Sequence, residues 1–123
     1  MKKNEFKDEI FKLLDSKVEE LDLNEKLKLV RAYLIEKEKD AEYDDSNKGK
    51  EWSDDELRIV LSFSPTNANC LFLAKAFKRG YGSIEQIFRW ASTSDKVIND
   101  KGRTNDKFIQ QIKRIAREIG WRV

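Results

Sequence analysis

Basic side chains are concentrated in the last part of this 123-residue chain, where their number could serve to hold a polyanion. From Lys75 onward there are 12 Lys and Arg residues against 5 Asp and Glu residues, although the whole chain carries a net charge of only +2. Residues 1–50 have 12 basic against 14 acidic side chains, and residues 51–123 have 13 against 9. A surface of one charge sign attracts ligands of the other sign. The charge distribution therefore predicts a site for an anionic partner in the C-terminal half.

Catalytic and metal-binding chemistry has few candidates in the same sequence. There is no His, which removes the usual general base, the commonest metal ligand and every Ser-His or Cys-His pair. Residues 44–55 have the spacing of a calcium-binding loop, but Lys48 stands where a ligand is needed. The single Cys70 lies among apolar neighbours and is predicted to be a small buried hydrophobe. We predict no enzymatic activity, no catalytic residue, no metal and no cofactor.

Start and stop signals divide the C-terminal half into short helices, so we expect an all-α fold. Ser53 and Glu56 form a capping box that begins a helix over about 54–62. Pro65 ends it, and a second helix is capped by Thr66 or Asn67 and runs to Gly80. Tyr81 and Gly82 are expected to form a turn before a third helix, which begins with a second capping box at Ser83–Gln86. Residues 92–103 are expected to form a polar loop. A last helix follows over about 105–119.

Two helices joined by a tight glycine-containing turn are typical of a helix-turn-helix DNA reader, whose later helix enters the major groove. Gln pairs bidentately with adenine and Arg with guanine, whereas Glu accepts from cytosine or merely caps a helix. The outward positions of the third helix are the candidate base contacts: Glu85, Gln86, Arg89 and Thr93. The candidate phosphate contacts are Lys75, Lys78, Arg79, Ser83, Lys113, Arg114 and Arg117. An ordinary solvated helix face, with Lys78 and Arg79 favouring the helix dipole, is the alternative interpretation.

Residues 52–91 resemble a divergent Myb/SANT repeat, a member of the homeodomain-like helix-turn-helix group. The motif segments are Trp52–Leu57, Leu73–Phe77 and Ser83–Trp90. The family has core tryptophans about 19 residues apart, and Trp52 and Trp90 are 38 apart, with Leu71 or Phe72 at the middle position. The resemblance implies a three-helix fold with both tryptophans in the core. It also implies either DNA binding or, as in SANT domains, protein binding.

The N-terminal half is expected to form an amphipathic helical hairpin. Apolar residues recur at spacings of three and four over residues 4–21 and again over 27–34, with Asp22 or Asn24 as a cap between them. Such a hairpin cannot bury both apolar faces alone, so it needs the C-terminal domain, a second copy of itself or another protein to cover them. The charged stretch 36–50 reads as a linker, so we expect domains at 1–45 and 46–123.

These observations favour a double-stranded DNA-binding protein, either a small transcriptional regulator or an accessory factor of a phage or mobile element. The alternative is a SANT-type adaptor or inhibitor that binds protein without binding DNA. A homodimer or a protein partner would form through residues 4–35, and neither a membrane contact nor a small-molecule substrate is expected. No apolar run suits a signal peptide or a membrane span, so we expect a cytoplasmic location, at the nucleoid in a bacterium or phage.

Overall fold

The computed structural model of the chain describes residues 1–122, and every regular element in that range is a helix. This confirms the expected all-α class. The chain divides into two compact units, Met1–Asp40 and Ala41–Val123. The division falls before the expected Asp45 because part of the supposed linker packs on the second unit: Tyr43 donates its hydroxyl hydrogen to the carbonyl of Arg79 at 2.9 Å. None of the helices in residues 1–122 combines the length and apolar character needed to cross a bilayer.

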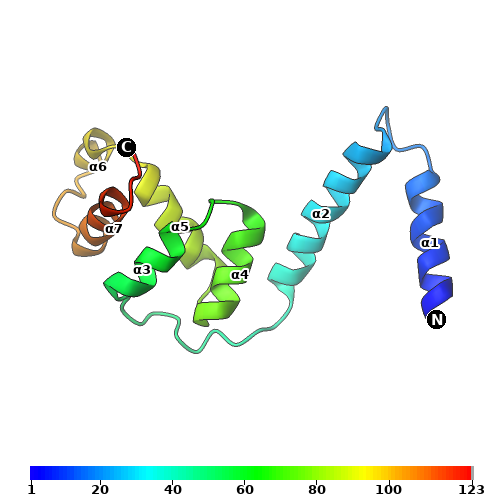
Figure 1. The fold of residues 1–123 in the computed structure, drawn as a ribbon, viewed down its shortest axis with the longest axis horizontal. Helices are drawn as coiled ribbons and strands as arrows, with labels where there is room; N and C mark the ends of the chain where they lie inside the picture. The colour runs from blue at the N-terminus through cyan, green and yellow to red at the C-terminus, as the bar shows by residue number, and fades with distance from the viewer. Residues whose placement is uncertain (123) are drawn as a thin grey trace. The chain divides into compact units, whose positions relative to one another are not determined.

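The first unit is the expected antiparallel hairpin of α1 (Lys3–Asp15) and α2 (Leu23–Asp40) (Figure 1). Asp22 caps α2, since its Oδ1 accepts from the backbone N–H of Glu25 at 2.8 Å. Lys26 reaches back from α2 and donates to the carbonyls of Leu14 at 2.8 Å and Ser16 at 2.6 Å, which satisfies the end of α1. Neither helix contains a buried residue.

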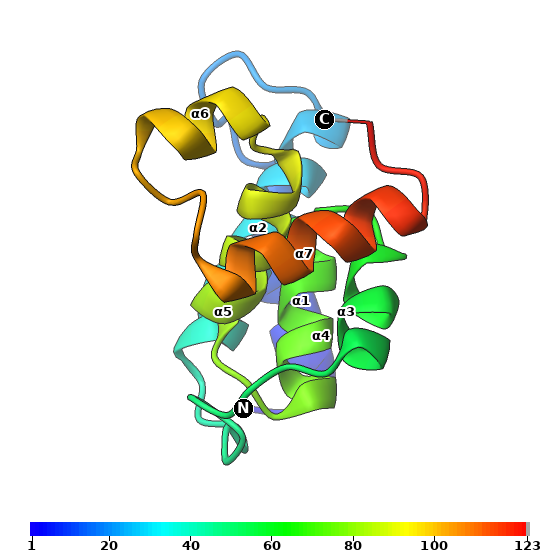
Figure 2. The ribbon, with the colours of Figure 1, turned by 90° about the vertical axis from the view of Figure 1, so that its left-hand side faces the viewer.

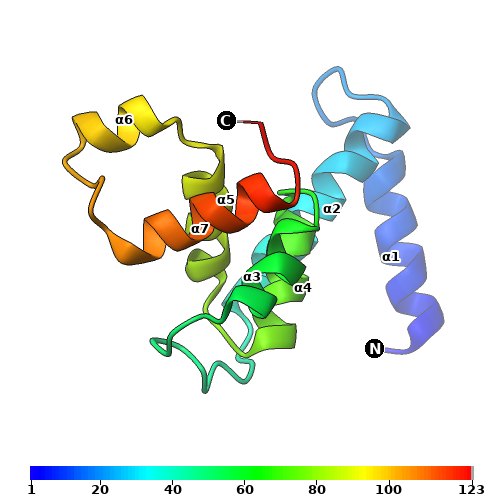
Figure 3. The same cartoon turned by 60° about the vertical axis from the view of Figure 1, so that its left-hand side comes forward.

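The second unit contains α3 (Asp54–Leu61), α4 (Asn67–Phe77), α5 (Tyr81–Ser92), α6 (Asp95–Asp100) and α7 (Lys107–Glu118). The capping box of Ser53 and Glu56 is present, and Thr66 caps α4 by accepting from the backbone N–H of Asn69. Helix α5 is the central element, in contact with α3, α4 and α7. Figure 2 shows α7 lying across α5, and Figure 3 shows the same crossing from another side.

The turn between α4 and α5 differs from the expected one. Helix α4 ends at Phe77, and Lys78 rather than Gly80 adopts the left-handed conformation, with φ +56°. Gly80 is instead the N-cap of α5, so Tyr81 and Gly82 belong to the helix and not to the turn. Ser83 therefore lies inside the first turn of α5, where its backbone N–H donates to the carbonyl of Gly80. The expected second capping box is wrong because the helix begins two residues before it.

Helix α5 supplies the centre of the core, through the buried residues Ile84, Ile87, Phe88 and Ala91. Trp52 and Cys70 are buried as expected, whereas Trp90 is only half-buried at the edge of the core. The aromatic ring of Phe77 meets Trp52 edge-on, with 5.5 Å between ring centroids. Side chains on one face of α5 thus bring three other helices together.

The expected polar loop at residues 92–103 contains a short helix, α6, which Ser94 caps by accepting from Val97. The C-terminal end of α5, which precedes α6, is capped by Lys113 of α7. Its ammonium donates to the carbonyls of Thr93 at 2.7 Å and Ala91 at 3.3 Å, and the residue is only 1% exposed. Burial, followed by the charge of Arg117, lowers the pKa of Lys113, while Asp95 opposes this shift.

We predict that Lys113→Met lowers the free energy of unfolding by about 1–2 kcal/mol at neutral pH, because it leaves helix-terminal carbonyls without donors. Unfolding returns Lys113 to its ordinary pKa of 10.5, so the unfolded chain binds more protons just below that pH. Native stability should therefore rise with pH in that range, and this rise should be absent in the variant. Urea denaturation between pH 7 and 10 measures both effects.

The matched control is Lys107→Met, which removes an exposed lysine from the first turn of the same helix. It should change stability by less than about 0.5 kcal/mol. Equal stability losses in the two variants would contradict the capping role of Lys113.

Candidate functional site

The four candidate base contacts lie along one side of α5 and its C-cap Thr93, which we call the ridge of α5. Gln86 and Arg89 are exposed, whereas Glu85 and Thr93 are half-buried. Thr93 donates its hydroxyl hydrogen to the carbonyl of Arg89 at 2.6 Å, which ties the C-terminal end of the ridge to the helix backbone. Within residues 1–122 the guanidinium of Arg89 forms no ion pair, so it is available to a ligand.

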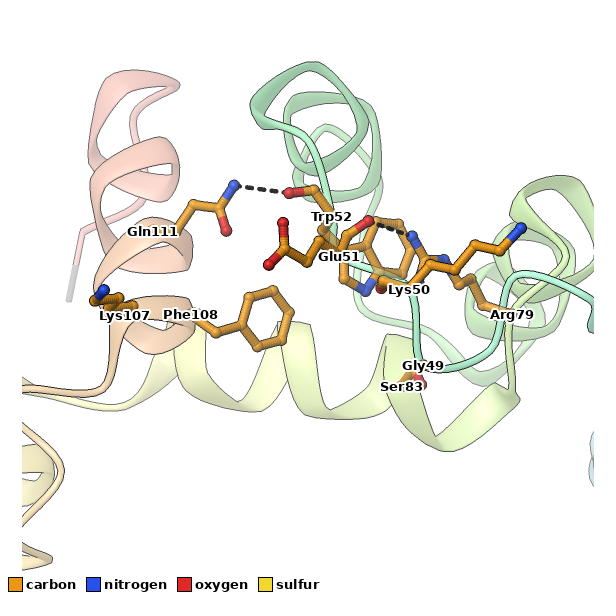
Figure 4. A pocket seen from close by; sticks show the side chains of 9 residues that line it. All are labelled: Gly49, Lys50, Glu51, Trp52, Arg79, Ser83, Lys107, Phe108 and Gln111. Carbon is orange, nitrogen blue, oxygen red and sulfur yellow. Dashed lines mark hydrogen bonds between the residues drawn. The ribbon is translucent and has the colours of Figure 1, made fainter.

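A groove of about 490 Å³ lies between Ser83 in the first turn of α5, the start of α7 and the segment that leads into α3 (Figure 4), and none of the four candidate base contacts lines it. Lys50 and Lys107 come from opposite walls, and Ser83 comes from α5. Phe108 lies between the walls as a half-buried aromatic side chain. The residues that line the groove are Gly49, Lys50, Glu51, Trp52, Arg79, Ser83, Lys107, Phe108 and Gln111.

The two lysines of the groove belong to a longer row of basic residues along α5. At the N-terminal end, the Cε atom of Lys48 lies 3.9 Å from the position that a Cβ on Gly80 would occupy. Near the C-terminal end, the ammonium of Lys101 and the guanidinium of Arg103 lie 5.5 and 5.9 Å from the ring centroid of Trp90. We call this row the cationic flank; its members are Lys48, Lys50, Lys101, Arg103 and Lys107.

The expected phosphate contact of Arg79 is wrong. The residue is only 3% exposed, and its side chain binds the segment before α3. Its Nη1 donates to the carbonyls of Asn47, at 2.8 Å, and Lys50, and its Nη2 donates to the carbonyl of Glu51 at 2.9 Å. The guanidinium also stacks on Trp52, 4.1 Å from the ring centroid. Arg79 is therefore the structural anchor of this segment, and it holds Lys50 in the groove wall.

Three further candidates, all on α7, also serve the fold. Burial of Lys113 excludes a phosphate contact there, since its charge is directed at the end of α5. Arg114 binds both carboxylate oxygens of Asp54 at 2.9 and 3.0 Å, and Arg117 binds Asp95 at 2.6 Å. These exposed ion pairs neutralise part of the charge that the sequence assigns to a ligand.

The Asp54 and Glu118 carboxylates confirm that α7 uses its charges internally. The hydrogen bond from Gln111, followed by that from Arg114, lowers the pKa of Asp54 below its ordinary value. Hydrogen bonding to Arg58 lowers the pKa of Glu118, and the Arg58 Nε to Glu118 Oε2 distance is 2.6 Å. The face of α7 that meets α3 is therefore a structural ion-pair surface.

The remaining phosphate candidates keep some exposure. Lys75 and Lys78 are exposed at the end of α4, and Lys78 pairs loosely with Asp44 at 3.5 Å. Ser83 lines the groove. None of the five members of the cationic flank is among the phosphate contacts predicted from sequence. Lys48 and Lys50 lie in the expected linker, Lys101 and Arg103 in the expected loop, and Lys107 near the start of the expected last helix. Their only signal is the presence of Lys and Arg in segments just outside the expected helices or at the start of one.

We predict that Arg79→Lys lowers the free energy of unfolding by about 2–3 kcal/mol, because one ammonium cannot replace a planar fork that bonds several carbonyls. Urea denaturation followed by tryptophan fluorescence measures the loss, and hydrogen exchange should accelerate at residues 47–51. Arg89→Lys, the same change at an exposed site on α5, is the control and should alter neither quantity. If the two variants behave alike, Arg79 does not anchor the segment.

Comparison with known proteins places the chain in a family. Residues 46–123 match the family described as "Uncharacterised protein PM1205 C-terminal domain". The chain is also 45% identical, over 122 residues that cover 97% of each protein, to "Uncharacterized protein PM1205" of Pasteurella multocida (strain Pm70). No solved structure matches the chain. The resemblance of residues 52–91 to a Myb/SANT repeat stays a prediction. Since the matched region covers more than half of the chain and includes all five helices of the second unit, the chain belongs to the PM1205 C-terminal domain family.

Proposed function

We propose that the unit Ala41–Val123 binds double-stranded DNA, with the ridge of α5 toward the major groove and the cationic flank on the phosphate backbone. The observation that carries this proposal is the placement of five basic side chains from two separate segments beside one helix. Basic side chains that follow a helix in this way provide the sequence-independent part of DNA affinity.

The dimensions of α5 suit this arrangement. Its 12 residues make a helix about 18 Å long, and duplex DNA carries one charge per about 1.7 Å of its axis. A flank of that length meets several phosphates at once. Gly82, exposed in the first turn with open space where a Cβ would stand, permits close approach to the helix N-terminus.

The ridge supplies side chains that read base edges. Gln86 and Arg89 are exposed one helical turn apart, and their amide and guanidinium groups suit adenine and guanine. Glu85 stands beside them as the acidic member, and it disfavours approach of phosphate on that side while permitting a contact to cytosine. In this proposal, recognition of base sequence by α5 depends on Gln86 and Arg89, and the affinity for duplex DNA depends on the cationic flank.

A protein-binding adaptor is the second candidate, and one observation favours it. Phe72 on α4 is 58% exposed, and its ring lies 5.9 Å from that of the half-buried Phe63. Exposed aromatic pairs are common in protein interfaces. This pair carries no charge and offers nothing to a phosphate backbone, so the two candidate functions use different side chains.

We predict that Lys50→Gln/Lys107→Gln weakens binding to random duplex DNA and makes the affinity less dependent on salt. Each lost phosphate contact should flatten the slope of log affinity against log salt by about 0.9, so the double variant should lose about 2. Fluorescence anisotropy with a labelled duplex, from 25 to about 200 mM salt, measures this. The thermal unfolding of the variant should match that of the parent protein.

The charge-matched control is Lys28→Gln/Lys37→Gln, which removes two exposed cations from the hairpin. It should leave the slope unchanged. Absence of duplex binding by the parent protein at the lowest salt would refute the proposal and direct the search to a protein partner, with Phe72→Ser as the first variant. An equal change of slope in both double variants would show that net charge, and not the cationic flank, determines binding.

A further inference from the structure

The hairpin Met1–Asp40 leaves its apolar surface open to solvent. Nine large apolar side chains are between 37% and 68% exposed: Phe6, Ile10, Phe11, Leu13, Val18, Leu23, Val30, Tyr33 and Leu34. The second unit, by contrast, encloses a continuous core. Isolated helices of this length are only marginally stable in water. The hairpin therefore needs a covering surface to remain folded.

The apolar residues of both helices follow the pattern of a helical bundle. On α2, Leu23, Leu27, Val30 and Leu34 are spaced by four, three and four residues, which is the a/d pattern of a heptad repeat. On α1, Phe6, Ile10 and Leu13 follow the same spacing. Two neighbouring helices thus each present a seam suited to packing against further helices at a shallow angle.

The contact between α1 and α2 leaves the apolar residues of these seams only partly buried. A cavity of about 190 Å³ lies between the two helices, lined mainly by apolar side chains. Its lining includes Leu13, Val18, Val30 and Tyr33, which are all exposed. The two helices form one half of a bundle, with space between them for side chains from another surface.

We infer that the surface covering this hairpin is the hairpin of a second copy of the chain, so that two copies form a four-helix bundle. Charge favours this partner. Residues 1–40 carry 10 basic and 11 acidic side chains, which are interspersed on both helices. A nearly neutral, mixed surface lets two copies approach without repulsion, whereas an acidic or basic partner would be recognised by a hairpin of opposite net charge.

The exposed area is also sufficient for a stable pair. The nine apolar side chains together expose on the order of 800 Å² per copy, the area that each partner contributes to a standard protein interface. Burial of this apolar area in both copies drives association and folding of the hairpin together. The inference concerns residues 1–40 alone and does not depend on the proposed DNA binding.

Sedimentation equilibrium of the full chain tests this inference against variants of α2. The parent protein of 14.5 kDa should sediment as a dimer, and its helical circular dichroism should fall on dilution as the hairpins separate. Val30→Glu/Leu34→Glu places two carboxylates on the seam and should raise the dissociation constant at least about a hundredfold. The second unit should keep its thermal transition, because it encloses a core made of its own residues.

The control is Ala32→Glu, which adds the same side chain at an exposed position on the opposite face of α2. It should remain dimeric. A parent protein that is monomeric at about 100 µM, whether or not its hairpin is helical, would overturn the inference, since apolar seams of this size should pair well below that concentration. A dimer that survives Val30→Glu/Leu34→Glu would place the contact elsewhere and overturn it as well.

Discussion

The guanidinium of Arg79 is the contact on which the arrangement of the second unit depends. It lies just after the C-cap of α4, stacks on Trp52, and donates to three backbone carbonyls within residues 47–51. That segment leads straight into the capping box of α3 and carries two members of the cationic flank, Lys48 and Lys50. A buried cation surrounded by carbonyl oxygens thus links the start of α3, the turn between α4 and α5, and one wall of the groove.

Bonds from cations to groups within the protein explain why the net charge of the C-terminal half overstates the positive charge that is available to a ligand. Arg58, Arg114 and Arg117 are paired with carboxylates, while Arg79 and Lys113 are bonded to backbone carbonyls. Cations of this kind fix helices against one another and have little attraction left for a distant polyanion. The remaining basic residues are fewer. Those of the cationic flank lie beside α5, where Arg103 also pairs with Asp106 at 3.6 Å, so their position matters more than the overall count.

Much of the fold could be predicted because it rests on local chemistry. The capping box at Ser53 and the cap at Thr66 follow from residues near one another in sequence, and the burial of Trp52 follows from its large apolar side chain; the structure contains all three. The turn before α5 was mispredicted because glycine is the usual left-handed residue, whereas here Lys78 takes that conformation while its carbonyl accepts from the backbone of Asn47. A contact from 31 residues away decides that turn, and no local pattern contains it.

The candidate site was harder to predict for the same reason. Whether an arginine faces solvent or a carbonyl depends on which segment packs over it, so Arg79 is buried and Arg89, only ten residues away, is exposed. The two units also differ in what they need: the second completes its core from its own helices, whereas the first completes none. If the hairpins pair, each dimer carries two copies of the groove on one assembly. Binding of one copy would then raise the local concentration of duplex at the other, so that a modest affinity per unit suffices.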